Sequence, residues 1–202
     1  MMLALFVASL AAAQAQASSN DVPAKYQAAW DACRNEKLDF SREGVGAELK
    51  GCSDLIAATD LNDNEIKAIA HTNRGMLNGQ ANRFDVAKSE FDEAIKLNPK
   101  LAPALYNRAL LFSTMGDTKA AVADYTAAIS ALPKMVEAYI NRGIIFAQSG
   151  QLDLALADFS KAIELEPGSA DNYENRAHLL RDMGRTADAD ADEAKARQLM
   201  KK

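Results

Sequence analysis

Small and aromatic side chains recur along the chain with a fixed spacing of 34 residues. The triplet Asn-Arg-Gly or Asn-Arg-Ala occurs four times, beginning at Asn73, Asn107, Asn141 and Asn175. If the last residue of each triplet is position eight, the frames begin at residues 68, 102, 136 and 170. A period of this length is typical of stacked helix pairs. The pattern therefore predicts an all-α repeat array.

The positions between the triplets fit two closely packed helices in each frame. Positions 20 and 27 are always alanine, and position 24 is aromatic in the first three frames. The alanines are Ala87, Ala121, Ala155 and Ala189, then Ala94, Ala128, Ala162 and Ala196; the rings are Phe91, Tyr125 and Phe159. Small residues allow two helices to approach, and the ring fills the space between neighbouring units.

Turn residues mark where the two helices of each frame end. Position 15 is Asn82, Gly116, Gly150 or Gly184, and position 32 is Pro99, Pro133 or Pro167 in the first three frames. Glycine and asparagine tolerate the left-handed conformation that ends a helix. Proline cannot extend the hydrogen-bond pattern of the second helix. Each frame is thus predicted to hold two helices.

This set of positions, over residues 68–202, resembles the tetratricopeptide repeat (TPR) family. Asn78 at position 11, Glu193 at position 24 and Lys201 at position 32 depart from the family pattern. The resemblance implies a right-handed solenoid of antiparallel helix pairs with degenerate terminal repeats, in which the first helices line a concave groove. The chain is similar to small periplasmic TPR proteins of Gram-negative bacteria.

Four segments follow from these positions. Residues 1–17 form a signal peptide, 18–66 a degenerate helical hairpin, 67–168 three TPR units and 169–202 a capping unit. In the hairpin we expect helices over 23–35 and 45–58, with Gly44 and Gly46 in the loop, and a helix cap at 62–65. In the last unit, Glu193 and its polar neighbours suit a face that no further repeat covers.

The first residues resemble a secretory signal. A short apolar run is followed by small residues and by Ala15-Gln16-Ala17, which fits cleavage after Ala17. No basic residue precedes Lys25, so a poor hydrophobic helix or a start codon placed too far downstream remains the alternative. Export predicts a periplasmic or secreted protein.

The two cysteines, Cys33 and Cys52, both precede the repeats. In an oxidising compartment such a pair favours one disulfide, and in a cytosolic protein it favours two buried thiols. The predicted signal makes the disulfide the preferred expectation. The two residues lie on opposing helices of the predicted hairpin.

An arginine at position seven and an acid at position 23 accompany each other in every frame. The pairs are Arg74 with Glu90, Arg108 with Asp124, Arg142 with Asp158, and Arg176 with Asp192. One interpretation is a basic stripe for an anionic ligand. We prefer an ion pair between the two helices of each hairpin, because a partly buried charge requires a partner.

The asparagines of the triplet are candidate ligand contacts. In some long TPR superhelices an asparagine at this position hydrogen-bonds the backbone of an extended peptide, and an amide can both donate and accept. Packing between repeats is an equal alternative. Apolar positions beside them complete the candidate groove, which comprises Asn73, Asn107, Asn141, Asn175, Tyr106, Leu110, Ile140 and Ile144. Self-association could cover the same stripe.

Composition and motifs argue against other function classes. The net charge of −5 disfavours nucleic acid, and no later segment is apolar enough to span a membrane. His71 and His178 lie far apart in an array where only neighbours touch, and no metal or phosphate motif is present. We therefore expect no enzyme, no metal and no cofactor. The predicted function is binding of a peptide or protein along the groove; the alternative is a self-associating accessory subunit of an envelope complex.

Overall fold

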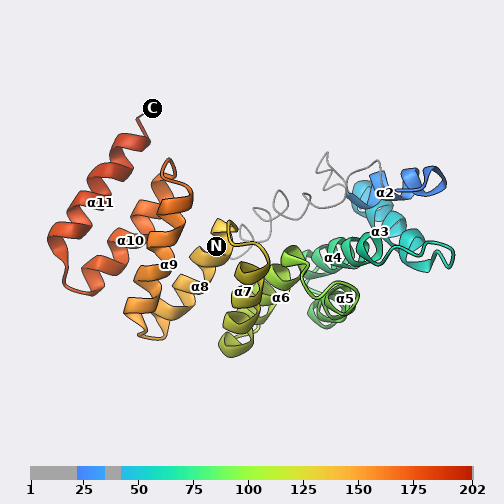
Figure 1. Ribbon diagram of the computed structural model, residues 1–202, viewed down its shortest axis with the longest axis horizontal. Coiled ribbons are helices and arrows are strands. Elements are labelled where there is room, and N and C mark those ends of the chain that lie inside the picture. Colours follow the sequence, from blue (N-terminus) through green and yellow to red (C-terminus); the bar gives the residue numbers. More distant parts are fainter. Residues whose placement is uncertain (1–21, 35–41, 202) are drawn as a thin grey trace. The chain divides into compact units, whose positions relative to one another are not determined.

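The computed structural model describes residues 22–34 and 42–201. Within these ranges the chain forms ten α-helices, one 3-10 helix and no strand (Figure 1). The predicted signal segment, residues 1–17, lies outside the described residues. The chain divides into two compact units, one ending at Met115 and the other beginning at Gly116, and each is described by itself.

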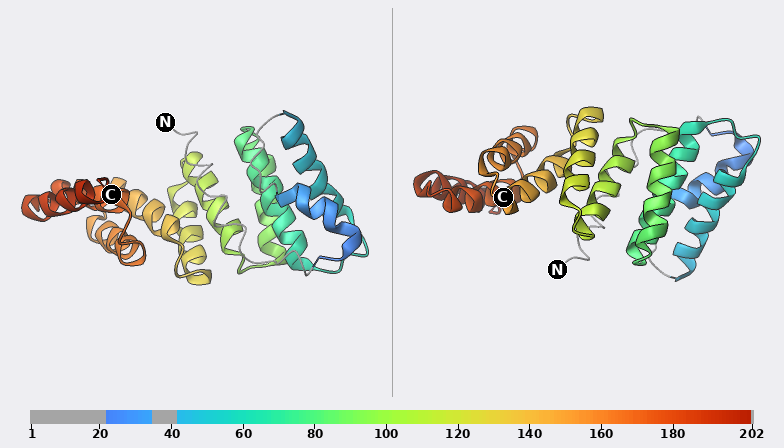
Figure 2. Two further views of the ribbon diagram at one scale, coloured as in Figure 1. Left: turned by 90° about the horizontal axis from the view of Figure 1, so that it is seen from above. Right: turned by 90° about the horizontal axis from the view of Figure 1, so that it is seen from below.

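Unit 1 is a stack of short helices that follow one another along the chain. Its elements are η3 (Ala24–Tyr26), α2 (Gln27–Arg34), α3 (Arg42–Ala57), α4 (Asn64–Gln80), α5 (Phe84–Leu97) and α6 (Ala102–Thr114). Each helix from α2 onward packs against the next, and α4 also contacts α2 and α6 (Figure 2). Contacts between alternate helices are the arrangement expected of a helical solenoid.

A disulfide joins the first two α-helices of unit 1. Cys33 of α2 and Cys52 of α3 are bonded, with their Cα atoms 4.6 Å apart, and both are buried. Gly51 lets α2 and α3 approach closely, because a Cβ there would be 2.6 Å from the carbonyl oxygen of Ala29. The disulfide preferred from the sequence is present, and it lies in the same core cluster as Trp30 of α2 and Leu55 of α3.

The sequence predicts that two glycines lie in the loop of this hairpin, and that prediction is wrong. Gly44 and Gly46 lie inside α3, which begins at Arg42. A glycine within a helix costs about 1 kcal/mol relative to alanine, which packing elsewhere along a 16-residue helix can offset. The predicted cap of the following helix is confirmed, because the Asp63 carboxylate accepts hydrogen bonds from the backbone N–H groups of Glu65 and Ile66.

Unit 2 continues the alternation of first and second helices. Its elements are α7 (Thr118–Ala131), α8 (Val136–Gln148), α9 (Leu152–Leu165), α10 (Ala170–Asp182) and α11 (Thr186–Leu199). Helices α8 and α9 form one pair and α10 and α11 another, and α8 also packs on α7 as α10 does on α9. Three residues separate the helices of each pair, so the pairs are antiparallel hairpins (Figure 1).

The predicted turn residues adopt the backbone conformation for which they were singled out. Asn82 has a φ of 57°, and Gly116, Gly150 and Gly184 have φ values of 82°, 73° and 73°. All four lie in the left-handed region directly after a first helix. The second helices α5, α7 and α9 each end two residues before a proline of the repeat. Local backbone chemistry therefore marks where the four first helices and the second helices α5, α7 and α9 end.

Close contact between a ring and a glycine fixes the spacing within two hairpins. A Cβ built on Gly75 of α4 would lie 2.6 Å from Cε1 of Phe91, and one on Gly143 of α8 would lie 2.9 Å from Cε1 of Phe159. Both rings are buried, and the alanines at positions 20 and 27 are 0–1% exposed. The ring therefore packs against bare helix backbone, as the small-residue pattern predicts.

We predict that Gly75→Ala lowers the free energy of unfolding, although alanine is the better helix former. Overpacking against Phe91 costs about 1–3 kcal/mol and exceeds the gain in helix propensity of about 1 kcal/mol. Urea unfolding followed by circular dichroism measures the difference. Gly46→Ala is the matched control, because no atom lies within 4 Å of its added Cβ, and it should leave stability unchanged or raise it. A Gly75→Ala protein as stable as the control would contradict this packing.

Candidate protein-binding surface

The position-seven arginines of unit 2 are held by their own hairpins. Arg142 of α8 donates from Nε and Nη2 to the two carboxylate oxygens of Asp158, at 2.9 and 2.7 Å. Arg176 of α10 makes the same two-pronged pair with Asp192, at 2.7 and 2.8 Å. The acid side chains are only 6% and 9% exposed. Two parallel charge-assisted hydrogen bonds orient each arginine firmly.

A third hydrogen bond from each arginine reaches the preceding second helix. Arg142 Nη1 donates to Thr126 Oγ1 of α7 at 2.9 Å, and Arg176 Nη1 donates to Ser160 Oγ of α9 at 3.2 Å. Both hydroxyls stand at position 25 of the frame before. Sequence inspection missed this contact, although a hydroxyl recurring 16 residues before the arginine is a usable signal. The arginine therefore connects three helices.

Unit 1 uses the same position with different partners. Arg74 Nη2 lies 2.9 Å from Glu90 Oε1, and Arg74 Nη1 donates to Ser53 Oγ of α3 at 3.1 Å. Arg108 Nη1 donates to Asp92 of α5 at 2.7 Å, which is again the position-25 residue. The predicted partner of Arg108 is Asp124 in the other unit, so that pair stays a prediction. No position-seven arginine is thus available as a simple anion-binding stripe.

Glu90 of α5 receives a second partner in His71. The His71 Nδ1 and Glu90 Oε2 atoms are 2.8 Å apart, in addition to the Arg74 contact. Burial works to raise the pKa of Glu90, but the hydrogen bonds from His71 and Arg74 outweigh it, so the pKa lies below its ordinary value of 4.5. One of the two histidines is therefore engaged in holding α4 to α5.

The asparagines of unit 1 face other parts of the protein. Asn73 Nδ2 donates to the backbone oxygen of Cys33 at 3.2 Å, across the contact of α4 with α2. Asn107 is 1% exposed, and its Nδ2 donates to the Pro103 oxygen one turn back in α6 at 2.8 Å. Tyr106 and Leu110 beside it are 4% and 5% exposed. These placements favour the packing interpretation in unit 1.

Unit 2 leaves the corresponding residues partly exposed. Ile140 and Ile144 of α8 lie one turn apart and pack against the cluster that contains Phe159, yet neither is fully buried. Asn141 and Asn175 are also partly exposed, and His178 of α10 is exposed. Residues four apart share one helix face. The candidate surface is therefore the first-helix face of α8 and α10, with apolar side chains on α8 and polar ones on α10.

Metal binding and membrane insertion are not indicated by the described part of the chain. Over residues 22–34 and 42–201, no group of three or more His, Cys, Asp and Glu side chains is placed to hold a metal ion. None of the described helices is long and apolar enough to cross a membrane.

We predict that Glu90→Gln lowers the free energy of unfolding by about 1–3 kcal/mol near neutral pH, because Arg74 loses a charged acceptor in a partly buried site. The stability contributed by the lowered pKa is full above the unfolded value near 4.5 and is lost as the pH falls through the folded value. Chemical unfolding as a function of pH should therefore show the two proteins converging in acid.

The matched control for this experiment is Glu93→Gln. The Glu93 side chain is 48% exposed and pairs with Lys96 on the surface of the same helix, so its loss should change stability by no more than about 0.5 kcal/mol. Equal effects of the two substitutions, or a Glu90→Gln deficit that persists in acid, would contradict the pairing described here.

Comparison with known proteins supports the repeat assignment directly. Three models described as tetratricopeptide repeat match the chain, one at residues 68–101 and 102–134, another at 136–169 and the third at 159–191. Together they span more than half of the chain. No curated protein sequence matches it.

Solved structures of similar fold are TPR proteins with low sequence identity. A crystal structure of MamA is 17% identical over 79% of this chain and 90% of its own, with a TM-score of 0.69. MamA 41-end from Desulfovibrio magneticus RS-1 is 19% identical over 86% and 96%, with a TM-score of 0.68. YrrB, a TPR protein with an unusual peptide-binding site, is 20% identical over 78% of each chain, with a TM-score of 0.62. The fold is thus an all-α TPR solenoid, and the chain belongs to the tetratricopeptide repeat family.

Proposed function

We propose that this protein is a non-catalytic interaction module that binds a peptide segment or partner protein along the first-helix face of unit 2. TPR proteins are in general interaction modules, and no enzyme family is indicated for this chain. The observation that supports the location is the difference in burial between the units. Ile140 and Ile144 keep exposed surface, whereas Tyr106 and Leu110 are buried.

The chemistry of this face suits a segment with an apolar anchor. Ile140 and Ile144 present a branched apolar strip along α8, and partly exposed apolar strips of this kind are common contact points for partner segments. Asn175 of α10 carries both donors and an acceptor, so it can satisfy one peptide group of an extended segment whatever its side chains. We infer that the isoleucines provide most of the affinity and that Asn175 orients the bound backbone.

We propose further that the protein is exported and works in the periplasm or outside the cell. The Cys33–Cys52 disulfide supports this proposal, because such bonds persist in oxidising compartments and are rare in the cytosol. The signal-like pattern of residues 1–17 supports it independently. A partner would then be another exported or envelope protein.

Self-association remains the second candidate function. A second copy of the chain could cover the same isoleucines within an envelope complex. The exposed strip would then be explained without a different partner protein. The two candidates differ in a measurable way, because self-association raises the molar mass of the purified protein.

We predict that Ile144→Asn reduces capture of the partner from an envelope extract about tenfold, because an apolar anchor is worth about 1.5–3 kcal/mol when it is fully buried. Capture is quantified by mass spectrometry with the tagged full chain as bait. Leu154→Asn is the matched control, since Leu154 is an exposed apolar residue on α9 of the same unit, at 49% exposure. Circular dichroism checks that both variants fold.

Light scattering on the same three proteins separates the two candidate functions. A wild-type monomer with capture lost only in Ile144→Asn supports partner binding. If the wild-type protein is a dimer and Ile144→Asn is a monomer, the result contradicts partner binding at this face and supports self-association. Equal capture by both variants would show that this face is not the binding surface.

A further inference from the structure

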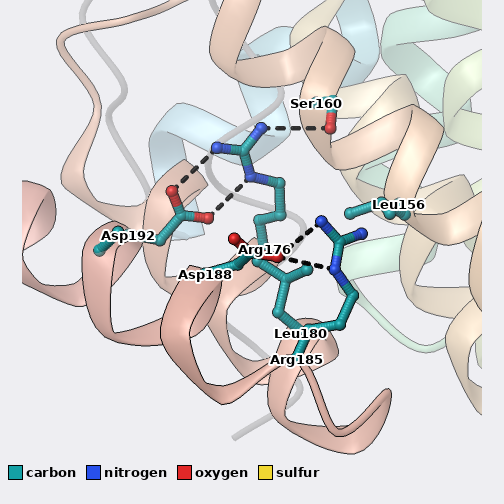
Figure 3. Close-up of a pocket in the computed structure, with 8 residues that line it drawn as sticks. Leu156, Ser160, Arg176, Leu180, Arg185, Asp188 and Asp192 are labelled. Atoms are coloured by element: carbon teal, nitrogen blue, oxygen red, sulfur yellow. Dashed lines mark hydrogen bonds and ion pairs between the residues drawn. The ribbon is translucent and has the colours of Figure 1, made fainter.

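A pocket of about 330 Å³ lies in unit 2 among α9, α10 and α11 (Figure 3). Leu156 of α9 and Leu180 of α10 contribute apolar surface to its lining. Arg176, which is paired with Asp192, also lines the pocket, as does the ion pair of Arg185 with Asp188. The Arg185 and Asp188 side chains are 47% and 54% exposed, so this pair is accessible to solvent at the edge of the pocket.

The preceding repeat shows what occupies the equivalent place. Each residue of the pocket has a counterpart 34 residues earlier, and Arg142 corresponds to Arg176. Both arginines make the same set of three hydrogen bonds, two to an acid of the following helix and one to a hydroxyl of the preceding helix. Over Arg142 lies the ring of Phe146, with its centroid 5.7 Å from the guanidinium carbon.

The last repeat lacks this ring. Leu180 stands where Phe146 stands one repeat earlier, and a leucine cannot stack on a guanidinium as an aromatic ring does. The second repeat also has a phenylalanine at position 11. The centroid of the Phe112 ring lies 5.8 Å from the guanidinium carbon of Arg108. The pocket therefore adjoins an arginine whose equivalents in two other repeats are covered by phenylalanine.

The edge of the pocket carries groups that suit a peptide backbone. Arg185 contacts Asp188 Oδ2 from both Nε, at 2.8 Å, and Nη2, at 2.7 Å (Figure 3). A guanidinium has five N–H donors and a carboxylate about four acceptor sites, so the pair keeps capacity for further hydrogen bonds. A peptide unit presents one carbonyl acceptor and one N–H donor. In the preceding repeat the two positions are Gln151 and Leu154, so this charged pair is specific to the last repeat.

We propose that this pocket binds a phenylalanine side chain of a partner protein, with the ring against Leu156, Leu180 and Arg176. The Arg185–Asp188 pair holds the flanking peptide group. A cavity of about 150 Å³ is enough to take up a benzene ring, so the volume here accommodates one ring with room for its Cβ. The residues of this pocket differ from those of the first-helix face, so the contact would add a second anchoring point for a bound chain.

The test titrates N-acetylphenylalanine N-methylamide into the full chain, with N-acetylalanine N-methylamide as the blank. Methyl NMR signals of Leu156 and Leu180 should shift with a Kd on the order of a millimolar, as expected for a ligand of this size. Leu180→Phe supplies the missing ring from the protein itself, so it should abolish the shift of the Leu156 methyls, which remain as the reporter in this variant. The variant should stay folded, because the two preceding repeats carry phenylalanine at this position.

A second variant tests the assignment to a protein segment. Arg185→Gln introduces the residue type found at Gln151 in the preceding repeat. It should lower the affinity for the phenylalanine amide about threefold to tenfold, because a charged hydrogen bond is lost, and leave the affinity for toluene unchanged. No shift of the leucine methyls at high ligand, or shifts that persist in Leu180→Phe, would overturn the site. Equal affinity for the amide and toluene, unaffected by Arg185→Gln, would overturn its assignment to a peptide.

Discussion

The arrangement of this protein depends on an arginine that binds two second helices at once. Arg142 and Arg176 each clamp the acid of their own hairpin and donate to a hydroxyl on the helix before, and Arg74 does the same with Glu90 and Ser53. A partly buried guanidinium without these acceptors would be costly. Because its five donors form a rigid fork, the side chain can satisfy both neighbours in one orientation. The spacing of adjacent hairpins is thereby fixed by a repeated polar contact as well as by apolar packing.

This contact also determines which surfaces remain for binding. With the arginines engaged in ion pairs, the first-helix face of unit 2 offers Ile140 and Ile144 as apolar contacts beside the asparagine amides and His178. This favours a partner segment with an apolar anchor over an anionic segment. The last repeat keeps the arginine contact but lacks the covering phenylalanine and carries an additional ion pair at Arg185 and Asp188. The terminal repeat thus keeps its paired helices, with Leu180 packed in the cluster that contains Ala189 of α11, but differs from the preceding repeat beside the pocket.

Much of the fold could be predicted from the sequence because its determinants are local or periodic. Backbone sterics and a fixed period predict the left-handed conformation of Asn82 and Gly150 and the prolines after the second helices. They also predict the small residue, Gly75, that packs against Phe91. The start of α3 could not be predicted, because glycines 44 and 46 lie within a helix that packing stabilises. The burial of Asn107 could not be predicted either, since the asparagines at the same position in unit 2, Asn141 and Asn175, are partly exposed. Such differences depend on neighbours in space that the period does not encode.

The arginine of the triplet holds neighbouring helices together, and a double-mutant cycle on Arg142 and Asp158 tests this role most directly. The free energies of unfolding of Arg142→Gln, Asp158→Asn and the double variant are measured in urea at low and high salt. A coupling energy of about 1–3 kcal/mol that survives high salt is the predicted result, because the acid is 6% exposed and the pair is weakly screened. Additive effects, with no coupling at either salt concentration, would contradict the account.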